Sequence, residues 1–82
     1  GGTIPTRLTV QCLTGEGNVA HILEQISEQY KTVSVGSYPW FKPGQFGTAV
    51  VLTGLDGKLV SNAANELCQL VKYAGFDAED AV

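Results

Sequence analysis

Apolar residues recur at every second position in some stretches of the chain and at every third or fourth position in others. This change of spacing along the chain constrains the fold most. In residues 7–13, Leu8, Val10 and Cys12 alternate with polar residues, which predicts a strand with one buried face. Residues 14–18 form a turn that ends in Asn18, the expected N-cap of a helix. The next residues carry an apolar stripe with helical spacing, namely Val19, Ile22, Leu23, Ile26 and Tyr30.

Two more strands are expected after this helix. Residues 32–38 place Val33 and Val35 on one face of a short strand. Residues 46–54 are the most continuously apolar part of the chain, which is typical of a central strand covered on both faces. Residues 37–45 are expected to form a long connection across which these two strands pair antiparallel.

A second helix is expected after a turn at residues 55–57. Asp56 is a favourable N-cap, and the helix is expected to end near Ala74. Gly75 and Phe76 are typical of a helix stop, in which glycine takes a left-handed conformation and the next apolar residue folds back on the last turn. The apolar stripe of this helix consists of Val60, Ala63, Ala64, Leu67, Val71 and Ala74.

The element order β-α-β-β-α places the chain in the α+β class. A strand–helix–strand unit favours a right-handed crossover between strands that run the same way. With the third strand in the middle, we expect a two-layer sandwich with a mixed three-stranded sheet, in the order 1-3-2, and two helices on one face. The 82 residues are expected to form one small accessory domain, residues 1–82, with an acidic flexible tail at residues 77–82.

The charge distribution argues against two classes of partner. The net charge of −3 arises at the acidic end, where Asp77, Glu79 and Asp80 lie, and the rest of the chain is balanced. No basic stripe is visible, so a nucleic-acid partner is not expected. No apolar run approaches the ~20 residues of a membrane helix, and the first residues do not resemble a signal peptide. We therefore expect no membrane partner and a cytoplasmic location.

The residues that could carry chemistry are few. Cys12 and Cys68 both fall within apolar patterns and are expected to be buried free thiols. They form no Cys/His cluster, so no metal site is expected, and His21 is the single histidine. Glu24 and Glu28 lie on the exposed side of the first helix, away from any cleft. We expect a chain without enzymatic activity and without a cofactor of its own.

The stretch GSYPWFKPGQFG, residues 36–47, carries four of the seven aromatic residues together with two prolines and three glycines. One explanation is that the rings cap the end of a small core. The other is that Trp40 and Phe41, stiffened by the prolines, form a docking surface for another protein. The candidate interaction or ligand residues are Gly36, Ser37, Tyr38, Pro39, Trp40, Phe41, Lys42 and Phe46.

A ligand-binding function is the alternative for the same stretch. Residues 44–47 spell G-x-x-G, the tetrad that clamps nucleotides in KH domains, and the neighbouring rings and Lys42 suit a nucleotide or single-stranded RNA. In KH domains, however, this tetrad joins two helices, whereas here it opens a strand. The missing basic charge also counts against RNA.

Residues 33–54 resemble the C-terminal part of the CinA-like proteins, known as competence/damage-inducible proteins, which carry a molybdopterin-binding (MoCF-type) domain. Bifunctional eukaryotic FAD synthases have a similar arrangement. The matching elements are Gly1-Gly2 as the exit from a preceding domain, Arg7 to Cys12 as a first strand, Val35 to Pro39 as the GSYP signature, and Phe46 to Gly54 as the next strand.

This resemblance implies a KH-like accessory domain whose function within the family is undefined. It implies packing on the N-terminal MoCF-type domain of the same protein, or on a second subunit, through the aromatic stretch and the open face of the sheet. The nucleotide-pyrophosphatase activity of the family belongs to the other domain and is carried by none of these residues.

Overall fold

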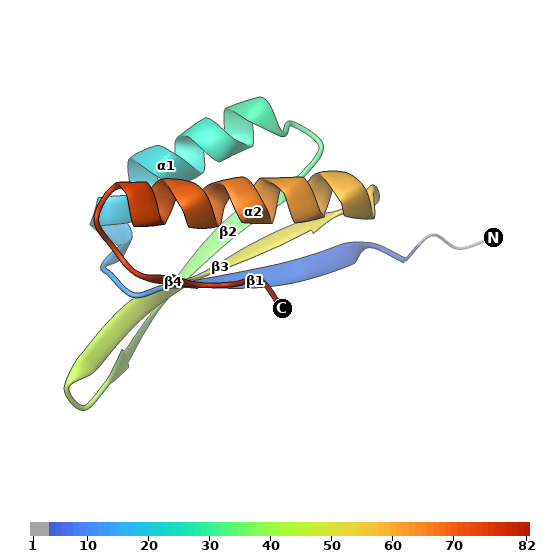
Figure 1. Cartoon of the computed structure of the whole chain (residues 1–82). Coiled ribbons are helices and arrows are strands. Elements are labelled where there is room, and N and C mark those ends of the chain that lie inside the picture. The colour runs from blue at the N-terminus through green and yellow to red at the C-terminus, as the bar shows by residue number, and fades with distance from the viewer. Residues whose placement is uncertain (1–3) are drawn as a thin grey trace.

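The computed structural model describes residues 4–82, so the expected exit from a preceding domain at Gly1-Gly2 lies outside the described residues. Figure 1 shows both helices on one face of the sheet, as the sequence predicts. Within the described residues the elements are β1 (Thr6–Cys12), α1 (Glu16–Gln29), β2 (Ser34–Lys42), β3 (Gln45–Gly54), α2 (Gly57–Tyr73) and β4 (Ala78–Glu79).

The sheet has the strand order β2-β3-β1-β4, and every neighbouring pair is antiparallel. The expected order 1-3-2 is therefore present, with one further strand at the edge of β1. β1 and β2 run in the same direction, as a crossover through α1 requires. The prediction of a mixed sheet is wrong, because β3 lies between these two strands and opposes both of them.

The acidic end of the chain forms the fourth strand instead of the expected flexible tail. Glu79 of β4 lies opposite Gln11 of β1. Beyond it, the Thr9 N–H donates to the Val82 carbonyl at 2.9 Å, and the Val82 N–H donates to the Thr9 carbonyl at 3.2 Å. The tail has one residue more than β1 between these two pairs, which defines a β-bulge. Backbone bonds to β1 thus hold a segment whose composition alone suggests a solvated end.

The expected long connection at residues 37–45 is a tight β-hairpin. β2 and β3 pair continuously as far as Lys42 opposite Gln45, so the turn consists of Pro43 and Gly44 alone. Proline fixes φ at the second position of the turn. Gly44 has a φ of +75°, which a type II turn requires at the third position. The hairpin places the aromatic residues on strands, where their directions are fixed.

The hairpin register explains how Pro39 is accommodated within a strand. Residues that flank a two-residue turn exchange both backbone hydrogen bonds, and bonded and non-bonded pairs alternate from there. By this count Pro39 and Thr48 form a non-hydrogen-bonded pair, and the nitrogen of Pro39 faces the free edge of β2. Proline therefore costs no ladder bond and interrupts an edge to which other strands would otherwise add.

The core lies between the sheet and the two helices. The inward-facing residues of β1 and β3 meet a continuous stripe of α2, and α1 completes the cover. Among the described residues, no helix is both long and apolar enough to cross a membrane. The largest fully buried side chains are Ile26, Leu52, Leu67, Val10, Val19, Val50, Val60, Val71, Thr48 and Cys12.

Both predicted ends of α2 are confirmed. The Asp56 carboxylate accepts hydrogen bonds from two backbone N–H groups of the first turn, at 3.0 and 3.3 Å. At the other end Gly75 has a φ of +97°, and the Phe76 N–H donates to the carbonyl of Val71 at 3.1 Å. This pattern of a left-handed glycine and a returning bond is a Schellman-type stop.

The predicted start of α1 is wrong by several residues. The helix begins at Glu16, with Gly15 at the N-cap and no side-chain cap bond. Asn18 lies within the first turn, and its side-chain amide donates to the Thr14 hydroxyl at 2.9 Å. The apolar stripe that begins at Val19 marks the buried face of the helix and gives no information on the exposed turn before it.

Candidate functional site

The β2–β3 hairpin projects away from the two helices (Figure 1). β1 accompanies β3 only as far as Cys12 opposite Thr48, so residues 45–47 of β3 pair with β2 alone. The candidate residues at 36–42 lie on β2, and Phe46 lies opposite Phe41 on β3. The sequence stretch singled out for its rings is therefore one projecting structural unit.

Strand alternation divides the candidate side chains between the two faces of the sheet. Val50 is buried beneath the helices and lies opposite Ser37 on β2, so the side chain of Ser37 shares the helix side. The neighbouring positions of β2 point to the open face. By this alternation Ser37, Pro39 and Phe41 lie on the helix side, and Tyr38, Trp40 and Lys42 lie on the open face.

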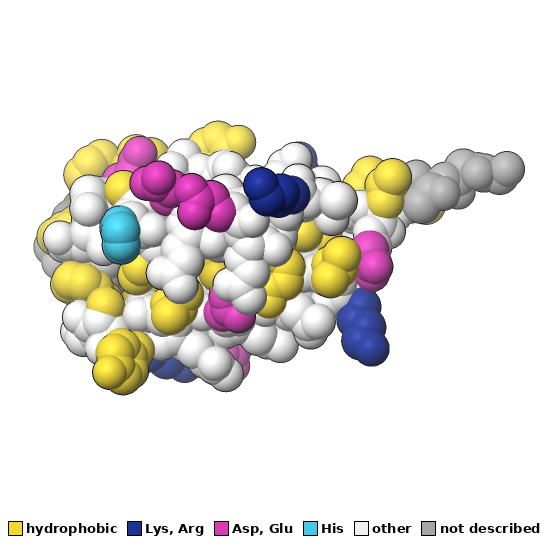
Figure 2. Space-filling view, turned by 90° about the horizontal axis from the view of Figure 1, so that it is seen from above, with side chains coloured by type: hydrophobic (Ala, Val, Ile, Leu, Met, Phe, Trp, Pro, Cys, Tyr) yellow, Lys and Arg dark blue, Asp and Glu magenta, His cyan; other side chains and the backbone are white. Residues whose placement is uncertain are grey.

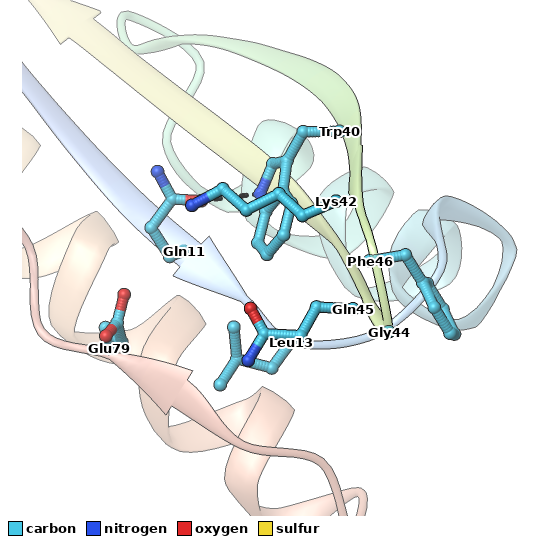
Figure 3. Close-up of a pocket in the computed structure, with 8 residues that line it drawn as sticks. All are labelled: Gln11, Leu13, Trp40, Lys42, Gly44, Gln45, Phe46 and Glu79. Carbon is cyan, nitrogen blue, oxygen red and sulfur yellow. Dashed lines mark hydrogen bonds between the residues drawn. The ribbon is translucent and has the colours of Figure 1, made fainter.

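Trp40 braces the hairpin against β1. A Cβ atom at Gly47 would lie 2.5 Å from Cζ2 of Trp40, so the indole rests directly on the glycine backbone. The indole Nε1 donates to Oε1 of Gln11 at 2.9 Å (Figure 3). The Lys42 ammonium lies over the ring, 5.2 Å from its centroid, in a cation–π contact. Trp40 therefore already has contacts for both its ring and its polar group.

Tyr38 covers a second glycine on the open face. A Cβ atom at Gly36 would lie 3.2 Å from the Tyr38 hydroxyl oxygen, so glycine leaves the space that the phenol ring occupies. The ring of Tyr38 nevertheless remains 60% exposed. It contributes an amphipathic surface on the open face rather than a buried contact.

Phe41 and Phe46 are the exposed rings of the hairpin. They lie opposite each other on β2 and β3, and their side chains are 80% and 56% exposed. We refer to this pair as the hairpin tip. None of the four rings of the hairpin belongs to the residues that pack against the buried core. The explanation that the rings cap the core therefore does not hold for these residues.

A groove of about 650 Å³ runs beside the hairpin, where β1 ends (Figure 3). The groove extends from β4, past the end of β1, to the open face of β2. Sequence reasoning missed Gln11, Leu13 and Glu79, because they come from the end of β1 and from β4, which only the sheet brings next to the hairpin. The signal available was the alternation in β1, which places Gln11 on the open face. The lining residues are Gln11, Leu13, Trp40, Lys42, Gly44, Gln45, Phe46 and Glu79.

The nucleophilic side chains lie away from this groove or beneath it. Cys12 and Cys68 are free thiols buried in the core, as predicted. Burial, and to a lesser extent the neighbouring Cys68, raises the pKa of the Cys12 thiol to about 11, so it is protonated at neutral pH. His21 is exposed on α1 (Figure 2). Within residues 4–82, no three His, Cys, Asp or Glu side chains are placed to hold a metal ion.

The structure defines a class of small α+β domain in which two helices cover one face of a four-stranded antiparallel sheet. A de novo designed protein, Foldit4, is similar to this chain with a TM-score of 0.62 and 15% sequence identity. The match covers 94% of this chain and 97% of that chain. At this identity the likeness shows the fold alone. No curated protein matches the sequence.

The sequence of this domain matches a family model over almost its whole length. Residues 6–80 match the model described as FAD synthase, middle domain, and the chain belongs to that family. This result supports the FAD synthase side of the resemblance seen in the sequence. The comparisons give no support to the CinA-like and KH-like parts of it.

Proposed function

We propose that this chain is a non-catalytic interaction domain, and that the hairpin tip docks on a flanking domain of the same polypeptide. The observation that carries the proposal is the exposure of Phe41, which is 80% on a hairpin that projects from the sheet. Rigid aromatic side chains on a defined backbone are typical anchors of protein interfaces. The hairpin ladder and the two-residue turn supply that rigidity.

The family description supports the choice of partner in this proposal. A domain described as the middle domain of FAD synthase has, by that description, a neighbour on each side. For this chain we propose that the partner is one of these neighbours, and that any synthase chemistry lies in them. The resemblance to proteins with a MoCF-type domain makes such a domain the first partner to test, and a second copy of this chain the next.

The size of the hairpin tip favours a tethered partner over a free one. A fully covered aromatic side chain buries about 200 Å², so the exposed fractions of Phe41 and Phe46 offer about 270 Å² together. A stable complex of separate proteins buries about 800 Å² on each partner. A tether raises the effective concentration of the partner to the millimolar range, at which a small contact suffices.

The alternative of a stacked nucleotide has less support from the geometry. Stacking on Trp40 requires a free ring face, whereas the glycine backbone of Gly47 and the Lys42 side chain already contact this ring. Phe41 and Phe46 remain open, but no cation lies over them in the described residues. We therefore favour a protein partner for the hairpin tip.

The test is binding in trans between this chain and a flanking domain of an FAD synthase. Phe41→Ala is expected to weaken the association at least tenfold, as for an aromatic anchor, while the melting temperature stays unchanged because the ring is exposed. Tyr73→Ala is the matched control, since this ring on α2 is 92% exposed and lies outside the hairpin. Calorimetry and amide chemical shifts would follow the binding.

Two results would contradict the proposal. The first is equal binding by Phe41→Ala and the unaltered chain. The second is a loss of binding with Tyr73→Ala that matches the loss with Phe41→Ala. A lowered melting temperature of Phe41→Ala would instead assign the ring a structural role.

A further inference from the structure

A short length of the β3 edge has no strand beside it. Because Lys42 and Gln45 flank the turn and exchange both backbone bonds, the N–H and C=O of Phe46 point away from β2. β1 pairs with β3 no further than Thr48, so no strand meets these groups. By the same alternation, the backbone N–H and C=O of Thr9 point toward β4. Both groups do bond there, to the backbone of Val82.

This unpaired edge faces the groove beside the hairpin. Phe46 is one of the lining residues, yet Figure 3 shows its side chain directed away from the others. Its backbone is therefore the part that faces the groove. A groove with an open strand edge as one wall can accept an extended peptide, which adds to the sheet through main-chain hydrogen bonds.

The other lining groups suit a peptide better than a phosphate. The Gln11 carbonyl accepts the bond from Trp40, which leaves the side-chain N–H groups of Gln11 as donors. Gln45 adds a second amide to the lining. Amides match the alternating donors and acceptors of a peptide backbone, whereas a phosphate needs several donors or positive charges and offers only acceptors.

The charges of the groove have opposite signs and lie at different levels of the sheet. Glu79 is opposite Gln11, which is opposite Ala49, whereas Lys42 is opposite Gln45. The carboxylate of Glu79 would repel a multiply charged anion. Glu79 and Lys42 together instead complement a peptide segment that has a basic residue near β4 and an acidic residue near the turn.

We propose that this groove binds an extended peptide segment, antiparallel to β3, that pairs with the backbone of Phe46. Antiparallel pairing makes the segment run in the direction of β1, so the basic residue comes first in its sequence and the acidic residue later. The inference rests on the proposed function and deepens it, because the segment belongs to the partner on which the hairpin tip docks.

The probe is a blocked peptide of sequence Lys-Thr-Val-Thr-Glu, compared with its reversed sequence Glu-Thr-Val-Thr-Lys. Amide shifts of the isotopically labelled chain are expected to saturate with the first peptide at the groove residues. The Phe46 amide is expected to become protected from hydrogen exchange, whereas those of its neighbours Gln45 and Gly47 already bond to β2. The first peptide is expected to bind about fivefold more tightly than the second.

Charge reversal supplies the decisive comparison. The double variant Lys42→Glu, Glu79→Lys exchanges the two charges at exposed positions and is expected to reverse the preference between the two peptides. A preference that stays the same in this variant would overturn the charge assignment. Binding of neither peptide, or protection that omits Phe46, would overturn the inference. Saturable shifts of the groove with AMP but with neither peptide would replace it with a small-anion site.

The inference and the proposed function fail separately. If Phe41→Ala weakens docking of the flanking domain but the double charge variant does not, the hairpin tip is confirmed and the peptide inference is wrong. If the peptides bind as described but Phe41→Ala leaves docking unchanged, the groove is confirmed and the hairpin tip is not the docking surface.

Discussion

The contact between Trp40 and Gly47 makes a strong prediction about stability. In Gly47→Ala the new methyl group would lie 2.5 Å from Cζ2 and 2.8 Å from Cε2 of Trp40, and 2.9 Å from the carbonyl oxygen of Cys12. Real Cβ atoms do not approach so closely. The ring must leave its position, and the carbonyl belongs to the backbone of β1, which cannot move without disturbing the sheet.

The cost follows from two effects. Overpacking of this kind costs about 1–3 kcal/mol. Displacement of the indole also breaks the hydrogen bond from Trp40 to Gln11, which contributes about 1 kcal/mol. The free energy of unfolding is therefore expected to fall by about 3 kcal/mol. For a domain of this size that corresponds to a decrease in Tm of about 15–20 °C.

Thermal and urea unfolding followed by far-UV circular dichroism would measure this loss. Gly17→Ala is the matched control, because a Cβ atom there meets nothing within 4 Å and the residue lies in α1. The same substitution at Gly17 is expected to stabilise the domain by up to about 1 kcal/mol. If Gly47→Ala unfolds at the temperature of the unaltered chain, the close packing of Trp40 on the sheet is refuted.

Two further predictions concern the cap of α2 and the buried thiol. Asp56→Ala removes the acceptor of two N–H groups and is expected to lower the free energy of unfolding by about 1 kcal/mol in urea titrations; an unchanged midpoint would contradict the cap. The pKa of Cys12 is about 11 in the folded chain against an ordinary value of 9.0, so below pH 9 both states keep the proton. Between pH 9 and 11 only the unfolded state releases it, and stability is expected to fall by at most about 3 kcal/mol. Cys12→Ala is expected to reduce this alkaline decrease, and an identical pH profile for both chains would exclude the thiol as its cause.

Local sequence signals predict the elements that depend on neighbouring residues. Asp56 and Gly75 mark the ends of α2 correctly, because a cap and a left-handed glycine satisfy backbone groups within one turn of the helix. The direction of β1 relative to β2 is also predictable, since a helix of this length joins strands that run the same way. These features need no knowledge of distant contacts.

The hairpin is not predictable from composition, because its residues are compatible both with a loop and with two paired strands. Pro39 and three glycines indicate a loop when they are considered separately. In the structure Pro39 lies on an edge strand with its nitrogen outward, and Gly36 and Gly47 make room for rings. Only the register of β2 against β3 shows that these residues belong to strands.

The groove and the fourth strand depend on contacts between distant segments. Gln11 meets Trp40 across 29 positions of the sequence, and Glu79 reaches the same place through the pairing of β4 with β1. A two-residue strand has too short an alternation to be recognised, and its acidic neighbours suggest a solvated end. Such sites become visible when the strand order is known.

Photo-crosslinking from Phe41 tests the central claim most directly. A photoreactive phenylalanine analogue would replace Phe41 in one sample and Tyr73 in another, with each chain joined to a flanking domain of an FAD synthase. The hairpin-tip account predicts cross-links to that domain from position 41 and none from position 73. Cross-links from position 73 alone, or equally from both positions, would contradict it.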